Sequence, residues 1–151
     1  MKRTIKVGII QQTCTNDIRH NLSKTAPQYR TGGGSRCTAR LYCRSCTTPL
    51  TSVRQKIRIC LIWQNRFPVP STGFYSELAA GYGIVLVTSL FEKRAPGLYH
   101  NTAVVFDKDG SIAGKYRKMH IPDDPAYYEK FYFTPGDLGF EPIQTSLGKL
   151  G

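Results

Sequence analysis

The chain begins with an apolar segment that predicts a buried strand followed by a helix. Isoleucine and valine dominate residues 4–12, and a continuous apolar run of this length is typical of a strand covered on both faces. Residues 15–17 are Thr, Asn and Asp, which commonly start helices, so we expect a helix to begin there and to include residues 21–23. The pattern then fails, because residues 24–47 are rich in Thr, Arg, Gly, Ser and Cys and show neither helical nor strand periodicity.

Regular patterning returns after Pro70 and predicts a helix, a buried strand and a hairpin. Ser71 or Thr72 can cap a helix that ends at Gly81 or Gly83, and residues 84–90 form an apolar run typical of a buried strand. Further strands are expected at 101–107 and 112–118 around a turn at 108–111, with a loop over 119–140, a short strand at 141–146 and a turn at 148–149.

Length and composition indicate one domain, or half of a larger one. The 151 residues contain no apolar run long enough to cross a membrane, and residues 7–10 are too short for the core of a signal peptide. Five cysteines, an odd number, in a chain without an export signal favour reduced thiols. We therefore expect a cytoplasmic protein.

Almost all of the net charge of +11 lies in the middle of the chain. No acidic residue occurs between Asp17 and Glu77, whereas ten basic residues do; outside this stretch eleven bases face ten acids. A basic segment of this kind, here residues 19–66, can bind nucleic acid, and a steep salt dependence of binding would support that alternative.

The same segment contains four of the five cysteines and invites a metal-binding interpretation. Cys43 and Cys46 have the spacing of half a zinc site, but Cys37 and Cys60 are single, and closed zinc sites usually combine two tight pairs. The glycines of residues 31–35 lack the Gly-Lys-Ser/Thr ending of a phosphate-binding loop. We expect neither a metal nor a cofactor.

Residues 114–137 form the most informative stretch of the chain. They combine basic, acidic and aromatic side chains with three prolines, at positions 122, 125 and 135. Such a segment is too polar for a core element, and prolines lower the entropic cost of holding charged groups in place. A rigid functional loop is the leading interpretation, since binding and catalytic residues commonly lie on loops that a scaffold positions.

This stretch resembles the carbon–nitrogen hydrolase (nitrilase) superfamily, and within it the N-carbamoylputrescine amidases. The resemblance rests on Tyr-Arg-Lys-Met-His-Ile-Pro at 116–122 and extends strongly over 71–151 and weakly over 1–23. It implies an α/β fold, namely part of an α-β-β-α sandwich. It also implies a hydrolase that cleaves a small linear amide or carbamoyl substrate, without a cofactor, in a homo-oligomer; a non-catalytic partner of an intact amidase is a further alternative.

The resemblance assigns roles to two residues of the loop. Lys118 corresponds to the lysine that stabilises the oxyanion of the tetrahedral intermediate, and Glu129 to a second glutamate that holds this lysine and helps to position the substrate. Without the resemblance, Lys118 would be interpreted as a surface lysine and Glu129 as a partner of Lys130. His120 is expected to form part of a pocket wall rather than to act as a base.

A group of four loop residues could bind a cationic amine, because carboxylates and aromatic faces both attract ammonium groups. Its members are Asp123, Asp124, Tyr127 and Tyr128. The alternative is a loop held by turn-forming aspartates and buried rings.

The rest of the family's catalytic set is not found in the chain. Cys14 follows the first strand at a position that is not catalytic in the family, and the nucleophilic cysteine would follow a strand beginning at or after Gly151. Residues 24–70 do not match the family. Reading the codons implied by residues 43–48 and 63–70 one nucleotide earlier gives family-like sequence, including a glutamate at the end of a strand. We therefore expect a shifted reading frame in this basic, disordered segment, and residues 1–151 as the inactive N-terminal part of one hydrolase domain.

Overall fold

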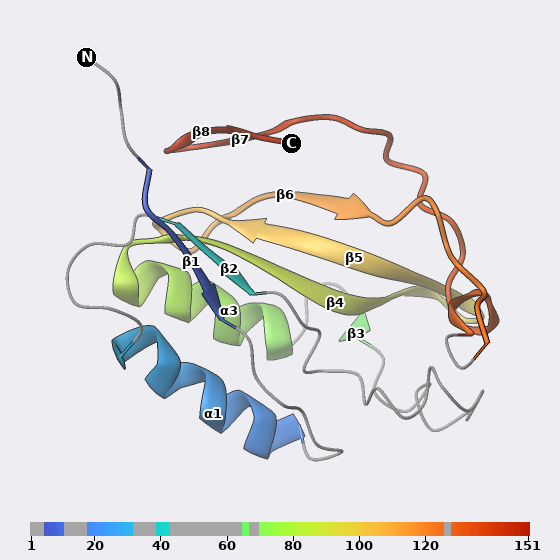
Figure 1. The fold of residues 1–151 in the computed structure, drawn as a ribbon, viewed down its shortest axis with the longest axis horizontal. Coiled ribbons are helices and arrows are strands. Elements are labelled where there is room, and N and C mark those ends of the chain that lie inside the picture. Colours follow the sequence, from blue (N-terminus) through green and yellow to red (C-terminus); the bar gives the residue numbers. More distant parts are fainter. Residues whose placement is uncertain (1–4, 11–17, 32–38, 43–64, 67–69, 126–127) are drawn as a thin grey trace.

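The computed structural model describes residues 5–10, 18–31, 39–42, 65–66, 70–125 and 128–151. Its main element is a twisted sheet with the strand order β1-β2-β4-β5-β6 (Figure 1). The elements are β1 (Val7–Ile10), α1 (Ile18–Thr31), β2 (Ala39–Tyr42), β3 (Asn65–Arg66), α3 (Pro70–Tyr82), β4 (Val85–Ala95), β5 (Leu98–Phe106), β6 (Ile112–Arg117), the 3-10 turn η2 (Glu129–Phe131), β7 (Ile143–Thr145) and β8 (Gly148–Leu150).

The sheet is mixed, and its two faces are covered differently. Strands β1, β2 and β4 pair in parallel, β4, β5 and β6 pair antiparallel, and β3 pairs in parallel with the end of β4. Helices α1 and α3 lie on one face, and the β7–β8 hairpin lies on the other (Figure 1). This arrangement agrees with the predicted α/β class.

The core beneath the helices is built from alternate residues of the strands. Tyr75 and Ala79 of α3 pack against Leu86, Val104 and Phe106, all of them buried. Because side chains alternate along a strand, Val85 and Val105 face the other way, where Leu147 covers them. The central strands β4 and β5 therefore have apolar side chains on both faces.

The predicted helix after Pro70 and its glycine stop are confirmed. Gly83 adopts a positive φ of 57°, and the amide of Ile84 donates to the carbonyl oxygen of Ala79 at 3.1 Å, which ends α3 and leads directly into β4.

The predicted hairpin between β5 and β6 is also confirmed, and its turn is fixed to α3. The amide of Asp107 donates to Ser111 O at 2.8 Å, and Gly110 adopts a φ of 84°. The hydroxyl of Ser76 donates to Gly110 O at 2.6 Å, and a Cβ at this glycine would lie 2.6 Å from Ser76 O. The turn needs glycine both for its backbone conformation and for its approach to the helix.

Three expectations are wrong in detail. The first strand is not buried on both faces: Val7 is 62% and Ile9 66% exposed, and only Ile10 is buried, because β1 lies at the edge of the sheet. Regular structure does not stop near residue 23, since α1 continues to Thr31 and β2 pairs with both β1 and β4. Residues 148–150 form a strand that pairs with β7 instead of a turn.

Candidate active site

Lys118 directly follows β6, and hydrogen bonds hold its backbone on two sides. Its amide donates to Asn101 O at 2.8 Å, which extends the β5–β6 pairing by one residue, and its carbonyl oxygen accepts from the amide of Gly136 at 2.9 Å. A Cβ at Gly136 would lie 2.0 Å from Arg117 O, so the segment around Gly136 approaches this strand end more closely than a side chain would allow. The backbone of Lys118 therefore lies between β5 and the 134–137 segment.

The ammonium group of Lys118 is paired with Glu129. Its Nζ donates to Glu129 Oε1 at 3.0 Å and to Oε2 at 2.9 Å, and the side chains are 36% and 18% exposed, respectively. Glu129 starts the turn η2, and its carbonyl oxygen accepts from the amides of Tyr132 and Phe133. The structure thus brings together the two residues to which the resemblance assigns catalytic and supporting roles.

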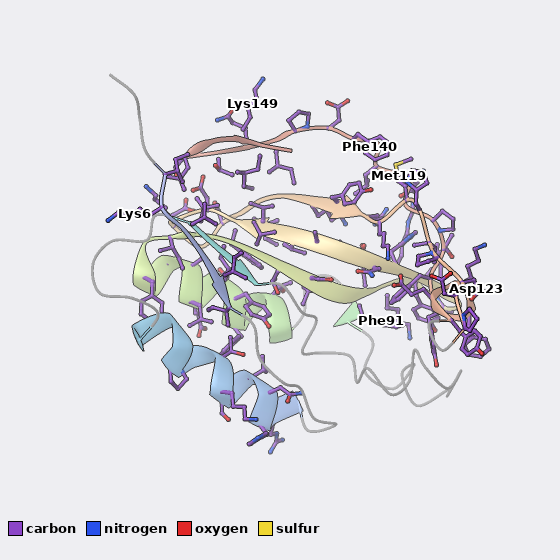
Figure 2. The ribbon with its side chains drawn as sticks, in the orientation of Figure 1. Lys6, Phe91, Met119, Asp123, Phe140 and Lys149 are labelled. Atoms are coloured by element: carbon purple, nitrogen blue, oxygen red, sulfur yellow. The ribbon has the colours of Figure 1, made fainter. Side chains whose placement is uncertain are left out.

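An aromatic cluster fixes the turn that carries Glu129. Phe91, which is 1% exposed, packs with its ring centroid 4.8 Å from that of Phe133 and 6.4 Å from that of Tyr132. Ile121 belongs to the same buried cluster, and Tyr99 packs against it. Figure 2 shows Phe91 at the end of the sheet from which the loop after β6 extends. The aromatic residues of the loop thus include a buried anchor for η2.

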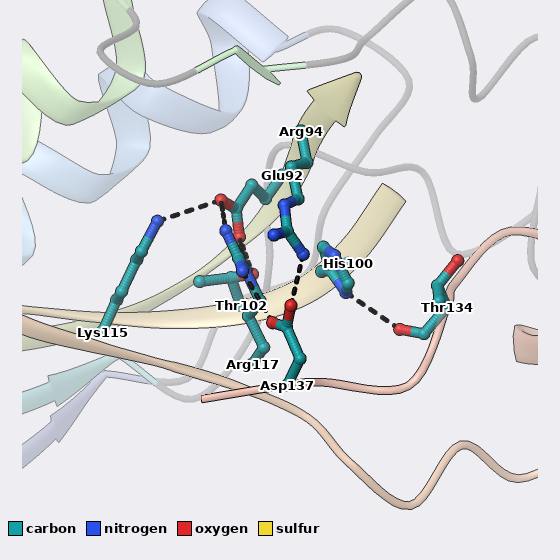
Figure 3. A network of polar contacts seen from close by, with 8 residues as sticks. All are labelled: Glu92, Arg94, His100, Thr102, Lys115, Arg117, Thr134 and Asp137. Carbon is teal, nitrogen blue, oxygen red and sulfur yellow. Dashed lines mark hydrogen bonds and ion pairs between the residues drawn. The ribbon is translucent and has the colours of Figure 1, made fainter. Parts of the chain in front are cut away.

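On the other side of the strand end lies an ionic cluster centred on Glu92 and Arg117 (Figure 3). Arg117 Nε and Nη2 donate to the two oxygens of Glu92 at 2.8 and 2.7 Å, and its Nη1 donates to Asp137 at 2.7 Å. Thr102 Oγ1 and Lys115 Nζ also donate to Glu92, at 2.7 and 3.1 Å. The cluster joins β4, β5, β6 and the 134–137 segment.

The charges of this cluster support one another. The side chains of Glu92 and Arg117 are only 3% and 7% exposed. Burial alone would raise the pKa of Glu92, but hydrogen bonds from Arg117, Thr102 and Lys115 outweigh it and lower the pKa from 4.5 to about 2. Hydrogen bonds from Arg117 and then Arg94 lower the pKa of Asp137 to about 2, and the bond to Glu92 raises the pKa of Arg117.

A surface pocket of about 840 Å³ lies beside Lys118. It is lined by residues 118–122, 130 and 133–135, so His120 does form part of a pocket wall, and the exposed Phe140 stacks on its ring at 6.3 Å. The loop continues past this wall to Asp123, which Figure 2 shows at the end of the sheet opposite Lys6.

Of the four residues considered for binding an amine, three are described, and they lie outside this pocket. Asp123 and Asp124 are exposed and Tyr128 is half-buried, and none of the three lines the pocket. Tyr127 lies outside the described residues, and so do all five cysteines, including the four considered for zinc. Among the residues that the structure describes, no three His, Cys, Asp or Glu side chains come together as a metal site, and no helix is long and apolar enough to span a membrane.

Sequence reasoning missed the ionic cluster. The strand predicted at 84–90 ended before Glu92, and Arg117 was given no role beyond that of a basic neighbour of Lys118. The sequence did contain a signal. Glu92 lies two residues beyond the apolar run at 84–90, within a strand that continues to Ala95, and Arg117 lies at the end of β6. Charged residues are rarely fully buried unless they are paired, so a partner on a neighbouring strand was to be expected.

Comparisons with known proteins agree with this geometry. The model of the carbon-nitrogen hydrolase family matches residues 51–151, which includes the end of the 24–70 segment and so reaches further than the resemblance described above. The crystal structure of a carbon-nitrogen hydrolase from Helicobacter pylori G27 superposes with a TM-score of 0.86 at 46% identity, over 97% of this chain and 50% of that one.

Two curated relatives match about half of the chain. An N-carbamoylputrescine amidase of Arabidopsis thaliana is 45% identical over 82 residues, which is 54% of this chain and 27% of that protein. A citrullinase of Francisella tularensis is 46% identical over 82 residues, 54% of this chain and 28% of that protein. The aligned part thus spans little more than a quarter of either relative. Because the family model matches more than half of the residues and the fold agrees, the chain belongs to the carbon-nitrogen hydrolase family.

Proposed function

We propose that this chain contributes the oxyanion-stabilising part of an amidase site that hydrolyses a small linear carbamoyl or amide compound. N-carbamoylputrescine is the first candidate substrate. The observation that carries the proposal is the Lys118–Glu129 pair: a lysine whose backbone is held on two sides, whose ammonium group is held by both oxygens of one carboxylate, and which lines a pocket. Family membership supports a hydrolase that acts on carbon–nitrogen bonds.

The chemistry explains why a fixed lysine is needed. When a thiolate adds to a carbamoyl carbon, the carbonyl oxygen gains negative charge, and an ammonium group already in place stabilises that charge without reorganisation. Collapse of the adduct expels ammonia, after protonation of the leaving nitrogen, and leaves a carbamoyl thioester. A water molecule then releases carbamic acid, which loses carbon dioxide to leave the amine.

The resemblance assigns the roles of nucleophile and base to a cysteine and to a glutamate other than Glu129, and no cysteine lies among the described residues. We propose that the 151 residues alone do not turn over substrate. Within the described residues, Lys118 stabilises the oxyanion and Glu129 keeps the lysine directed toward it. The pocket beside Lys118 has apolar walls from Ile121 and Phe133, which would exclude water from one side of the reacting group.

The choice of substrate follows from the relatives and from the charges of the loop. Four of the curated relatives carry the name N-carbamoylputrescine amidase. A substrate of that kind ends in an ammonium group, and Asp123 and Asp124 are exposed in the loop that continues from the pocket wall. These carboxylates would favour a cationic tail over a carboxylate tail.

The test measures ammonia release from N-carbamoylputrescine by the 151-residue chain and by a full-length version, in which the reading frame of residues 24–70 is corrected and the remaining part of a family domain is added after Gly151. We expect turnover only from the latter, and a loss of at least about a hundredfold in kcat for Lys118→Met, the usual cost of removing one oxyanion donor. Lys149→Met, which removes an exposed lysine from β8, serves as the matched control and should leave kcat unchanged. Full activity of Lys118→Met would refute the assigned role, and turnover by the 151-residue chain alone would show that it already contains a nucleophile.

A further inference from the structure

The segment 134–137 joins the two clusters that flank Lys118. At its start, the amide of Thr134 donates to Tyr99 O at 2.8 Å, and Thr134 O lies 3.0 Å from Nδ1 of the buried His100 (Figure 3). Near its end, the amide of Gly136 donates to Lys118 O. The segment thus runs beside β5 and the end of β6 immediately after the aromatic residues that anchor η2.

Asp137 is the last residue of this segment, and its side chain connects the segment to the buried ionic cluster at the strand end. Its carboxylate accepts from Arg117 at 2.7 Å, and Arg117 in turn is held by both oxygens of Glu92. Arg117 and Lys118 are consecutive, and successive side chains of an extended strand point to opposite sides. Arg117 therefore fixes the strand end from one side while Lys118 reaches Glu129 on the other.

Within the part of the chain that the structure describes, short backbone connections link the two clusters. Glu129 is held by η2 and the packing of Phe133 against Phe91, whereas the Lys118 backbone is held by Asn101 and Gly136. The 134–137 segment follows Phe133 directly, so a shift of this segment changes the position of Lys118 relative to Glu129. Asp137 is 46% exposed, and within the described residues its side chain contacts Arg117 and the exposed Arg94.

We propose that Arg117 and Asp137 are positioning residues for Lys118: the Glu92–Arg117–Asp137 bridge holds the 134–137 segment against the strand end and so sets the geometry of the Lys118–Glu129 pair. The consequence for the reaction rests on the function proposed above. The positioning itself does not, because it concerns the pairing of Lys118 in the free protein.

The test measures how fast Lys118 is acetylated by an amine-reactive ester, followed by peptide mass spectrometry. Pairing with Glu129 slows this reaction. A partly exposed ion pair contributes up to about 1 kcal/mol, so losing it should raise the acetylation rate by up to about fivefold. Glu129→Gln gives the reference for an unpaired lysine. We expect Asp137→Ala and Arg117→Gln to raise the rate at Lys118 about two- to fivefold, while the exposed Lys149 in the same digest stays unchanged.

Arg94→Ala is the matched control. It removes the exposed ion pair between Arg94 and Asp137 but leaves the bridge from Asp137 to Arg117 in place. It should leave the rate at Lys118 unchanged. A rise at Lys118 and Lys149 together would indicate general loosening and would count against the proposal, and so would an unchanged Lys118 in a folded Asp137→Ala protein. If Arg117→Gln does not fold, Asp137→Ala still allows the test. The side chain of Asp137 is half-exposed, so its removal should disturb the fold less than a change at the buried Arg117.

Activity separates this proposal from the proposed function. If the full-length protein releases ammonia, Asp137→Ala should lower kcat about two- to fivefold with KM unchanged, because the lysine is misplaced while the substrate contacts remain. An unchanged kcat and an unchanged acetylation rate would overturn the positioning role and leave the amidase intact. No hydrolysis of any amide by wild-type protein, with a selective rise at Lys118 in Asp137→Ala, would refute the function and support the positioning.

Discussion

Glu92 should make the stability of this protein depend strongly on acidity. Its folded-state pKa is about 2, compared with an ordinary value of 4.5, because three hydrogen-bonding partners outweigh the effect of burial. At about 1.4 kcal/mol for each tenfold change in proton affinity, this difference corresponds to about 3 kcal/mol. The side chain is only 3% exposed, so solvent screening reduces this figure little.

The direction follows from the lowered pKa. A carboxylate that binds its proton more weakly in the folded state than in the unfolded state stabilises the fold at pH values above about 4.5, and this contribution is lost as the pH falls from about 4.5 to about 2. Glu92→Gln removes the charge but keeps the shape of the side chain. The variant should therefore be less stable than wild type near pH 6.5, and the difference should shrink by up to about 3 kcal/mol toward pH 2.

Urea unfolding followed by fluorescence at several pH values measures this difference. Glu141→Gln, which changes an exposed glutamate in the segment before β7, is the matched control and should give a curve parallel to that of wild type. The reasoning is refuted if the difference between wild type and Glu92→Gln is the same at pH 6.5 and pH 2.5. In that case Glu92 would not be an ionised group held by Arg117, Thr102 and Lys115.

Two further substitutions test the supports of Lys118 and Glu129. Gly136→Ala would place a methyl group 2.0 Å from Arg117 O and should destabilise the protein by about 1–3 kcal/mol, so an unchanged melting temperature would contradict the close approach described for this glycine. Phe91→Ala should cost about 3–5 kcal/mol and accelerate hydrogen exchange at the amide of Phe133, which donates to Glu129 O; exchange as slow as in wild type would show that the aromatic cluster does not hold the turn.

The local features of this fold could be predicted from the sequence, and the non-local ones could not. Lys108-Asp-Gly-Ser between two apolar runs specifies the β5–β6 hairpin, because the turn chemistry is contained in four adjacent residues. The exposure of Val7 and Ile9 depends on which strand lies at the edge of the sheet, and no pattern within residues 4–12 carries that information. Helix α1 continues through residues 24–31 despite weak periodicity and an internal proline, Pro27.

The candidate site divides in the same way. Lys118 and Glu129 were predicted through the resemblance, and the structure pairs them, although their catalytic roles remain predictions. Glu92 and Arg117 lie 25 residues apart and meet only because β4 and β6 both flank β5. The positions of Asp123 and Asp124 relative to the pocket depend on how the loop is folded, which turn-forming residues alone do not specify.

The adjacency of Arg117 and Lys118 makes the length of β6 as important as its composition. Inserting one residue between the turn at Gly110 and the strand end would move each following side chain one strand position onward, so that it faces the opposite side of the sheet. Arg117 would then take the place of Lys118 beside Glu129, and Tyr116 would take the place of Arg117 beside the buried Glu92. Glu92 would lose its arginine partner, although net charge and hydrophobic pattern would hardly change. A homologue or variant with such an insertion would pass a composition-based comparison and still lose the lysine from the site.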